Sequence, residues 1–213
     1  MNGQKFQQVV QHAINLLQRE MLPAFTYHNM DHTLEVVRAC NRLAALEKID
    51  EESRHLLLIA AYFHDTGLTT ITSTDADTFN AGRAVHEERA VQIVRNILPT
   101  YGLKTEEIET IARLIMATKR DHIPVDVLEK IIADADISPI GQATSSFMRS
   151  NEALLRELRS FGMQIKNEEW YENQKEFIET CVYHTSAARD LFDKNRLLNM
   201  VAIQSRMKTP KTQ

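Results

Sequence analysis

The chain has 213 residues, of which 43% are hydrophobic and 25% are charged, as in ordinary soluble globular proteins. The net charge of −4 argues against a surface dedicated to nucleic acid or anionic membranes. The longest apolar run, LLLIAAYF at 56–63, is too short to span a bilayer, and the start of the chain lacks the pattern of a signal peptide. Cys40 and Cys181 form no CxxC motif, so we expect a cytoplasmic protein.

Six glycines and five prolines leave little turn material, which favours an all-α fold. Helical spacing predicts a first helix that ends before Pro23. A second is expected over about 30–47, with Leu34, Val37, Leu43 and Leu46 inward. A third starts near Glu51, carries LLLIAAYFHD and is apolar nearly all round. We therefore expect it to be the buried central helix, ended by Gly67 in the left-handed conformation.

Residues 66–82 are rich in Thr, Ser and Asp and predict a loop over a site. Helices are expected again over about 83–98, 105–118 and 125–135, and three or four more over 138–207, with breaks near Gly162 and Asn167. We interpret residues 1–207 as one domain, with a motif core over about 25–141 and C-terminal helices over about 142–207. Residues 208–213 are expected to be a disordered tail. We expect Trp170 and Tyr171 to pack the C-terminal helices onto the core, with base stacking as the alternative.

Two apolar segments end in residues that can bind a metal. His64 and Asp65 close the most hydrophobic segment of the chain, and Asp134 and Asp136 close the apolar segment KIIADAD. An ionised aspartate in such a place costs much free energy unless it is paired or bound to a metal. A buried polar network without a metal is the alternative, but every member of such a network must be satisfied.

A second pair of residues belongs to this constellation. His28 and His32 are four residues apart, which places them on one face of a helix. Imidazole and carboxylate ligands together suit Mn, Fe, Co, Ni, Zn or Mg. The absence of thiolates argues against a structural zinc site. We therefore expect a bound divalent metal ion.

Three segments, YHNMDH at 27–32, FHDTG at 63–67 and ADIS at 135–138, carry a family resemblance. One His, an adjacent His-Asp pair and a distant Asp resemble the motif of the HD superfamily of metal-dependent phosphohydrolases. The resemblance implies an all-helical HD-domain bundle, here with extra C-terminal helices. It also implies that the metal ligands are His32, His64, Asp65 and Asp136.

YHNMDH also resembles the opening motif of cyclic-nucleotide phosphodiesterases, in which the first His protonates the leaving oxygen and the second binds metal. This likeness makes His28 a candidate general acid; the alternative is a residue that caps the helix or supports a ligand. ADIS resembles the phosphodiesterase segment in which the Asp before Ile-Ser is a ligand. That likeness favours Asp136 over Asp134.

Several HD enzymes bind a second metal through histidines on the next two helices. His86 stands where the first of these is expected, but Thr118 occupies the second place and His122 follows four residues later. We therefore expect one metal rather than two. His86 and His122 remain candidates for a second ion or for substrate, against the alternatives of an exposed helix-start residue and a solvated loop histidine.

The resemblance implies hydrolysis by metal-activated water, with Asp65 or Asp136 orienting the water. Arg83, Lys119 and Arg120 are candidates for holding phosphate, although solvated surface charges are the simpler interpretation.

The leading hypothesis is a hydrolase that acts on a phosphoester, as a phosphodiesterase or phosphomonoesterase, with a nucleotide or related small phosphate as substrate. No nucleic-acid or membrane partner is expected, and a homodimer stays open. The first alternative is a catalytically silent module that senses nucleotides or interacts with a partner. The second is a di-iron oxygenase of the HD type. Thr118 counts against the oxygenase, because two irons need the second set of histidines.

Overall fold

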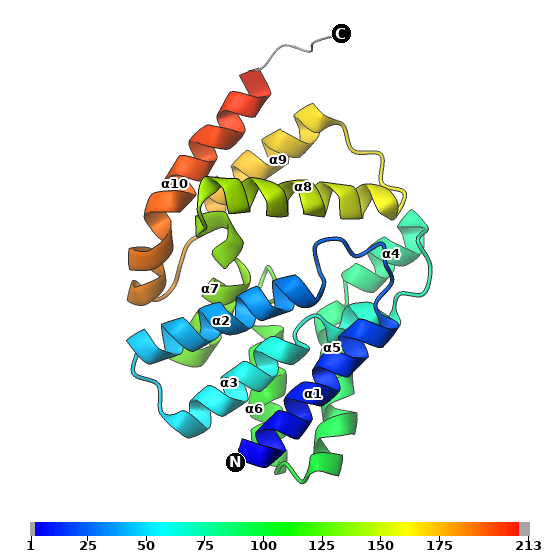
Figure 1. Ribbon diagram of the computed structural model, residues 1–213, viewed down its shortest axis with the longest axis vertical. Coiled ribbons are helices and arrows are strands. Elements are labelled where there is room, and N and C mark those ends of the chain that lie inside the picture. Colours follow the sequence, from blue (N-terminus) through cyan, green and yellow to red (C-terminus); the bar gives the residue numbers. More distant parts are fainter. Residues whose placement is uncertain (1–2, 209–213) are drawn as a thin grey trace.

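The computed structural model describes residues 3–208, and this part of the chain contains helices and no strand (Figure 1). The all-α prediction is therefore confirmed. The α-helices are α1 (Gly3–Glu20), α2 (Met30–Leu46), α3 (Glu51–Phe63), α4 (Ala76–Arg83), α5 (His86–Ile97), α6 (Thr105–Met116), α7 (Val127–Asp136), α8 (Thr144–Ser160), α9 (Asn167–Thr180) and α10 (Ser186–Lys208). Short 3-10 helices are η1 (Thr66–Thr70), η2 (Leu98–Tyr101) and η3 (Ser138–Gly141).

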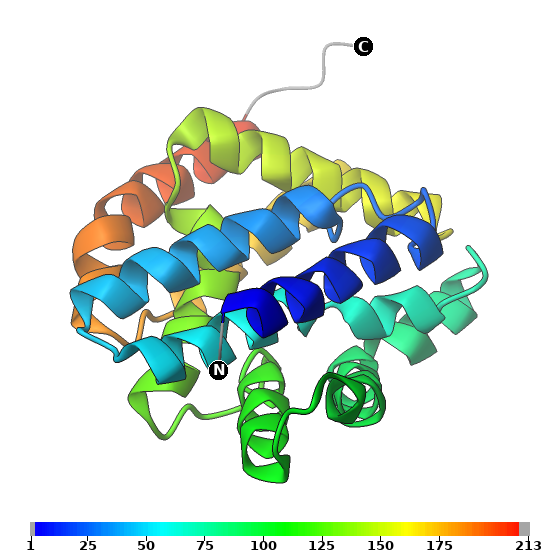
Figure 2. The same cartoon turned by 60° about the horizontal axis from the view of Figure 1, so that its bottom comes forward.

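The third helix is buried at the centre, as its apolar sequence predicts. Helix α3 packs against α1, α2 and α6, and its fully buried residues are Leu57, Ile59, Ala60, Ala61 and Phe63. Helices α8, α9 and α10 gather on one side of α2 and α7, and α1, α3 and α6 lie on the other (Figures 1 and 2). Helices α2 and α7 thus lie between the two groups.

Polar side chains fix where several helices start. Asn29, Asp50, Asp75 and Asp126 are N-caps of α2, α3, α4 and α7, and the side chain of each accepts a hydrogen bond from a backbone N–H of the first turn. Such caps satisfy donors that the helix leaves unpaired, and each stabilises its helix by about 1 kcal/mol.

The predicted loop over residues 66–82 is wrong. Most of this segment is helical, as η1 and α4. The threonine hydroxyls that suggested a loop are used locally: Thr69 and Thr70 donate to the carbonyl oxygens of Thr66 and Gly67. Phe79 is buried in a small second core beneath it, beside Phe161. Local hydrogen bonding by Thr and Ser is compatible with short helical turns as well as with loops.

Gly67 does not end α3 in the left-handed conformation. It lies inside η1, and among the glycines of residues 3–208 only Gly102 and Gly162 have positive φ. A Cβ atom on Gly67 would lie 1.8 Å from the carbonyl oxygen of His86. The glycine is therefore needed for close approach of two backbones, because it lets the start of α5 pack directly on η1.

The inward face of α2 differs in one place from the prediction. Leu43 is buried, but Leu46, the last residue of the helix, is 53% exposed. Helical periodicity identifies the buried face of a helix. It does not show how far the neighbouring helices extend along that face, so a residue at the end of α2 can stay exposed. The residues predicted to point inward over 83–98 and 105–118 are buried, which confirms these assignments. They are Ala90, Val91 and Val94 in α5, Leu98 at the start of η2, and Ile108, Ile111 and Ile115 in α6.

The C-terminal region contains three long helices, within the predicted number. The predicted break at Gly162 is confirmed by its φ of +79°; Asn167 begins α9, and a further break between α9 and α10 had no clear signal in the sequence. Trp170 is buried in the second core, as expected. Of the predicted disordered tail, Lys208 belongs to α10 and residues 209–213 lie outside the described part. No helix within the described residues is long and apolar enough to cross a membrane.

Candidate metal centre and its pocket

Three helix ends supply the side chains of the candidate metal centre. His32 lies in the first turn of α2, His64 and Asp65 directly follow α3, and Asp136 is the last residue of α7. Helix α2 packs against both α3 and α7, which brings these ends together. The Asn29 side chain fixes the start of α2, since it also accepts the backbone N–H of His32 at 3.4 Å.

The ligand atoms are spaced as they are around a single cation. Oδ1 of Asp136 lies 3.3 Å from Nε2 of His32 and 3.4 Å from Nε2 of His64. Oδ2 of Asp65 lies 3.2 Å from Nε2 of His64 and 3.6 Å from Nε2 of His32. Ligands held roughly 2.1 Å from an ion are about 3.0–3.4 Å apart at octahedral or tetrahedral angles. Ligand atoms of His32, His64 and Asp136 all lie within 4.8 Å of one another.

Buried atoms without hydrogen-bond partners test whether these residues fit a metal. Nε2 of His64 and Oδ2 of Asp65 are buried and have no such partner. The Nδ1–H of His64 donates to the carbonyl of Ala61 at 2.8 Å, so the lone pair on Nε2 is directed at the carboxylates. An unpaired buried polar atom costs about 1–3 kcal/mol, which a bound cation would offset. The donor set therefore fits a divalent metal ion.

The charges of the cluster also suit a cation. Burial opposes ionisation, yet Asp65 and Asp136 raise the pKa of His64 well above its ordinary value. Burial likewise opposes ionisation of Asp136, but His32 and His64 hold its pKa below the ordinary value. The carboxylates thus keep their negative charge. This charge holds protons on the imidazoles, and it would equally attract a metal ion, which would displace those protons.

Asp134 has a different role from Asp136. It is fully buried, and its carboxylate accepts the backbone N–H groups of His184 (2.7 Å) and Thr185 (2.8 Å) and the hydroxyl of Thr185 (2.7 Å). These bonds join α7 to the segment before α10. Of the two aspartates, only Asp136 lies beside the imidazoles of His32 and His64. It is the aspartate that the ADIS likeness favoured.

A glutamate that the sequence interpretation did not include holds His28. Oε1 of Glu157, in α8, lies 2.5 Å from Nδ1 of His28, and Oε2 accepts the backbone N–H groups of Tyr27 and His28. Burial acts to lower the pKa of His28, but Glu157 outweighs it and raises that pKa. Glu157 lies three residues after Leu154, on the buried face of α8. An acidic residue among apolar ones on a helix face was the sequence signal that could have indicated a buried, paired carboxylate.

The family model described as HD domain matches residues 29–138, just over half of the chain. The chain belongs to the HD-domain family. Among solved structures it is similar to a predicted HD superfamily hydrolase from an uncultured Thermotogales bacterium. That similarity has a TM-score of 0.55 and 20% identity over 94% of this chain and 89% of that one, and it confirms the HD-domain fold. No curated protein matches the chain.

One further imidazole faces the candidate metal centre of this HD domain. Nε2 of His86 lies 3.6 Å from Oδ1 of Asp65, the oxygen opposite the one that faces His32 and His64. The Nδ1–H of His86 donates to the carbonyl of Arg83 at 2.7 Å, which leaves Nε2 to face Asp65. Close packing at Gly67 holds the start of α5 in this position.

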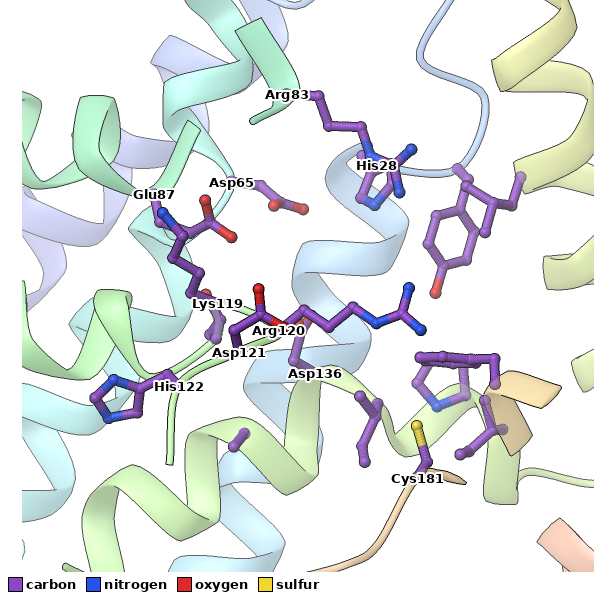
Figure 3. Close-up of a pocket in the computed structure, with 18 of the residues that line it drawn as sticks. His28, Asp65, Arg83, Glu87, Lys119, Arg120, Asp121, His122, Asp136 and Cys181 are labelled. Atoms are coloured by element: carbon purple, nitrogen blue, oxygen red, sulfur yellow. The ribbon is translucent and has the colours of Figure 1, made fainter. Parts of the chain in front are cut away.

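His122 is not brought to the cluster. Its Nε2 lies 3.1 Å from Oε2 of Glu129, which also accepts the backbone N–H of Val125. Figure 3 shows the His122 ring turned away from Asp65 and Asp136. The Thr118 hydroxyl donates to the backbone carbonyl of Ile115 at 2.8 Å.

The candidate metal centre of the HD domain opens into a cavity of about 980 Å³. Arg83, Lys119 and Arg120 line it together with His28, and Figure 3 shows Arg83 extending toward His28. Lys119 is paired with Glu88. Neither Arg83 nor Arg120 has an ion pair within residues 3–208, so two guanidinium groups are available to an anion in the cavity.

Proposed function

We propose that this HD-domain protein is a metal-dependent phosphohydrolase that cleaves a phosphoester of a nucleotide or related small phosphate. The observation that carries the proposal is the shared cavity: the His/Asp cluster, the His28 imidazole and three cationic side chains all line it or border it. A metal, a proton donor and phosphate-binding cations are the groups that such hydrolysis needs.

His32, His64, Asp65 and Asp136 would hold one divalent ion. When bound, the ion supplies a water of lowered pKa and polarises a phosphoryl oxygen. The two carboxylate oxygens of Asp65 face different imidazoles, with Oδ2 toward His32 and His64 and Oδ1 toward His86. Asp65 is thus suited to orient the attacking water.

His28 acts as the general acid. Its Nδ1–H is held by Glu157, so Nε2 carries the proton that can be given to the leaving oxygen. Because Glu157 raises the pKa of His28, more of the imidazole is protonated near neutral pH. Transfer of the Nε2 proton leaves a neutral imidazole that still donates from Nδ1 to Glu157.

Arg83 and Arg120 bind the phosphate oxygens, with Lys119 as a further cation. Guanidinium groups suit this task because they make paired hydrogen bonds with phosphate. Lys119 contributes less, because its ammonium group is already paired with Glu88.

The test combines metal analysis with turnover. Protein loaded with Mn²⁺ or Zn²⁺ is expected to hold about one equivalent per chain and to hydrolyse phosphomonoesters or phosphodiesters. His64→Ala should lose both properties, and His55→Gln, which changes a ring that packs against Phe6 outside the cavity, should keep both. Full turnover by His64→Ala would overturn the proposal. Binding of metal and nucleotide without product over hours would indicate a silent sensing module, and two irons with oxygen consumption would indicate an oxygenase.

A further inference from the structure

A buried glutamate in the first turn of α7 holds the segment that precedes this helix. Glu129 is 1% exposed. Its Oε1 accepts a hydrogen bond from Nη1 of Arg113, and its Oε2 lies 3.1 Å from Nε2 of His122 and accepts the backbone N–H of Val125 at 2.8 Å. Burial acts to raise the pKa of Glu129, but these three donors outweigh it and hold that pKa below the ordinary value. Glu129 therefore keeps its charge and ties α6 to the segment between α6 and α7.

The same segment contains a tight turn whose backbone bonds fix the position of Arg120. The backbone N–H of His122 donates to the carbonyl of Lys119 at 2.9 Å, which places Arg120 at the second position of a four-residue turn. At its other end, the backbone N–H of Lys119 donates to the carbonyl of Met116, the last residue of α6, at 3.1 Å. His122 thus closes the turn with its backbone and anchors it to Glu129 with its side chain.

The two cations of this turn line the cavity and reach different walls of it. Figure 3 shows Lys119 and Arg120 extending away from each other. The ammonium group of Lys119 is paired with Glu88 of α5. The Arg120 guanidinium lies 5.5 Å from the centre of the Phe177 ring of α9, and within residues 3–208 it has neither an ion pair nor a hydrogen-bond partner. Its N–H donors are therefore available to an anion in the cavity.

We propose that Glu129 is a positioning residue that, through His122, holds this turn so that Arg120 binds a phosphate oxygen of the substrate. The proposal rests on the proposed phosphohydrolase function, since it places the phosphate in the same cavity. Glu129 itself does not line the cavity. A turn released from Glu129 would carry Arg120 in many orientations, and ordering it again at each binding event costs conformational entropy. Loss of Glu129 therefore weakens substrate binding and leaves the chemical step unchanged.

The test separates affinity from turnover in the metal-loaded protein. KM and kcat are measured for 4-nitrophenyl phosphate, and the Kd of inorganic phosphate is measured by calorimetry. Glu129→Gln is expected to raise KM and Kd about tenfold, while kcat changes by less than about twofold. Glu109→Gln is the matched control, because it removes a carboxylate of α6 that is paired with Arg95 outside the cavity. Unchanged KM and Kd in Glu129→Gln would overturn the proposal.

A double-mutant cycle shows whether Glu129 acts through Arg120. Arg120→Gln alone is expected to raise KM about tenfold, as for one lost charge-assisted hydrogen bond. Adding Glu129→Gln to that variant should raise KM by less than about twofold more, because the side chain that Glu129 positions is already gone. If Glu129 only stabilised the fold, its substitution would cost the same in both backgrounds, and that result would contradict the proposal.

A second variant covers the case in which Glu129→Gln fails to fold. His122→Ala keeps the bond between Glu129 and Arg113 and removes the side-chain link to the turn. It should also raise KM about tenfold, whereas His122→Gln, whose amide can still donate to Glu129, should stay within about threefold of the wild type. A wild-type KM in His122→Ala would count against the proposal.

Failure of the hydrolase and failure of the positioning role have different signatures. Turnover with a KM that does not depend on Glu129 removes the positioning role and leaves the phosphohydrolase. Phosphate binding that depends on Glu129, without turnover of any phosphoester, removes the hydrolase and supports the positioning role. A wild-type protein that neither binds phosphate nor turns over a phosphoester would overturn both.

Discussion

Nδ1 of His28 lies 2.5 Å from Oε1 of Glu157, which is 129 residues away in the sequence. The other oxygen of Glu157 accepts two backbone N–H groups from the same turn as His28. Glu157 thus fixes both the ring and the backbone beneath it, and its full burial leaves its charge unscreened by solvent. The proton on His28 therefore depends on a helix that lies outside the matched HD segment.

Replacing Glu157 by Gln should lower kcat and shift its pH dependence. Without the carboxylate charge, burial dominates and lowers the pKa of His28, so the acid form is lost at a lower pH. The alkaline limb of the kcat profile should move to lower pH, and kcat near neutral pH should fall about 10–100-fold. Glu152→Gln, an exposed change in α8, is the matched control. The same alkaline limb in both variants would show that Glu157 does not set the protonation of His28.

The His28–Glu157 pair should stabilise the fold in a limited pH window. His28 has a raised pKa, so its contribution is full below its ordinary value of 6.5 and is lost as the pH rises through the folded value. Glu157 has a lowered pKa, so its contribution is full above its ordinary value of 4.5 and is lost as the pH falls.

A double-mutant cycle with His28→Gln and Glu157→Gln, measured by urea unfolding, should therefore give its largest coupling, about 2 kcal/mol, between these two pH values. A coupling that is independent of pH from 4 to 9 (roughly the range in which both groups titrate) would contradict this assignment.

Asp134 and Asp136 should respond differently to the same substitution. Asp136→Asn is expected to reduce bound metal from about one equivalent to nearly none, because a neutral amide is a poor ligand. Asp134→Asn should keep the metal but lower the unfolding free energy by about 2 kcal/mol, since the buried carboxylate accepts three hydrogen bonds. Metal content and chemical denaturation of both purified variants give the answer. Loss of metal from the Asp134 variant alone would reverse the assignment of the two aspartates.

Gly67→Ala should be strongly destabilising. Its Cβ would lie 1.8 Å from the carbonyl oxygen of His86, so α5 must move away from η1 and carry His86 from Asp65. We expect a loss of more than about 3 kcal/mol in unfolding free energy, measured by urea denaturation. Gly3→Ala has no atom within 4 Å of the new Cβ and should change stability by less than about 0.5 kcal/mol. A mild effect at Gly67 would mean that the two segments separate easily.

The sequence was most informative where ionisable side chains stand in an apolar segment. His64 and Asp65 end an apolar helix, and that conflict pointed to the place where the structure assembles the cluster. Local signals also predicted the helices well, because periodicity and N-caps act within a few residues. The role of Gly67 was predicted wrongly. A close approach of two backbones and a left-handed turn both favour glycine, so the sequence alone does not distinguish them.

Contacts between distant segments could not be predicted in the same way. Glu157 contacts Tyr27 and His28, which are far away in the sequence, and nothing near Glu157 in the chain identifies these partners. The loop predicted over residues 66–82 failed for a related reason. Its Thr and Ser side chains cap and brace short helices, and burial of Phe79 against Phe161 holds them in place.

The two sides of the cavity come from different stretches of the chain. The four candidate metal ligands, His32, His64, Asp65 and Asp136, belong to the matched HD segment, whereas the partner of His28 and part of the cavity lining belong to α8 and α9. Residues of α8 and α9 that line the cavity can thus change while the four candidate ligands stay the same. If the proposed function holds, sequence divergence among proteins of this architecture should concentrate in the part of the cavity that α8 and α9 form, and spare the part formed by the matched HD segment.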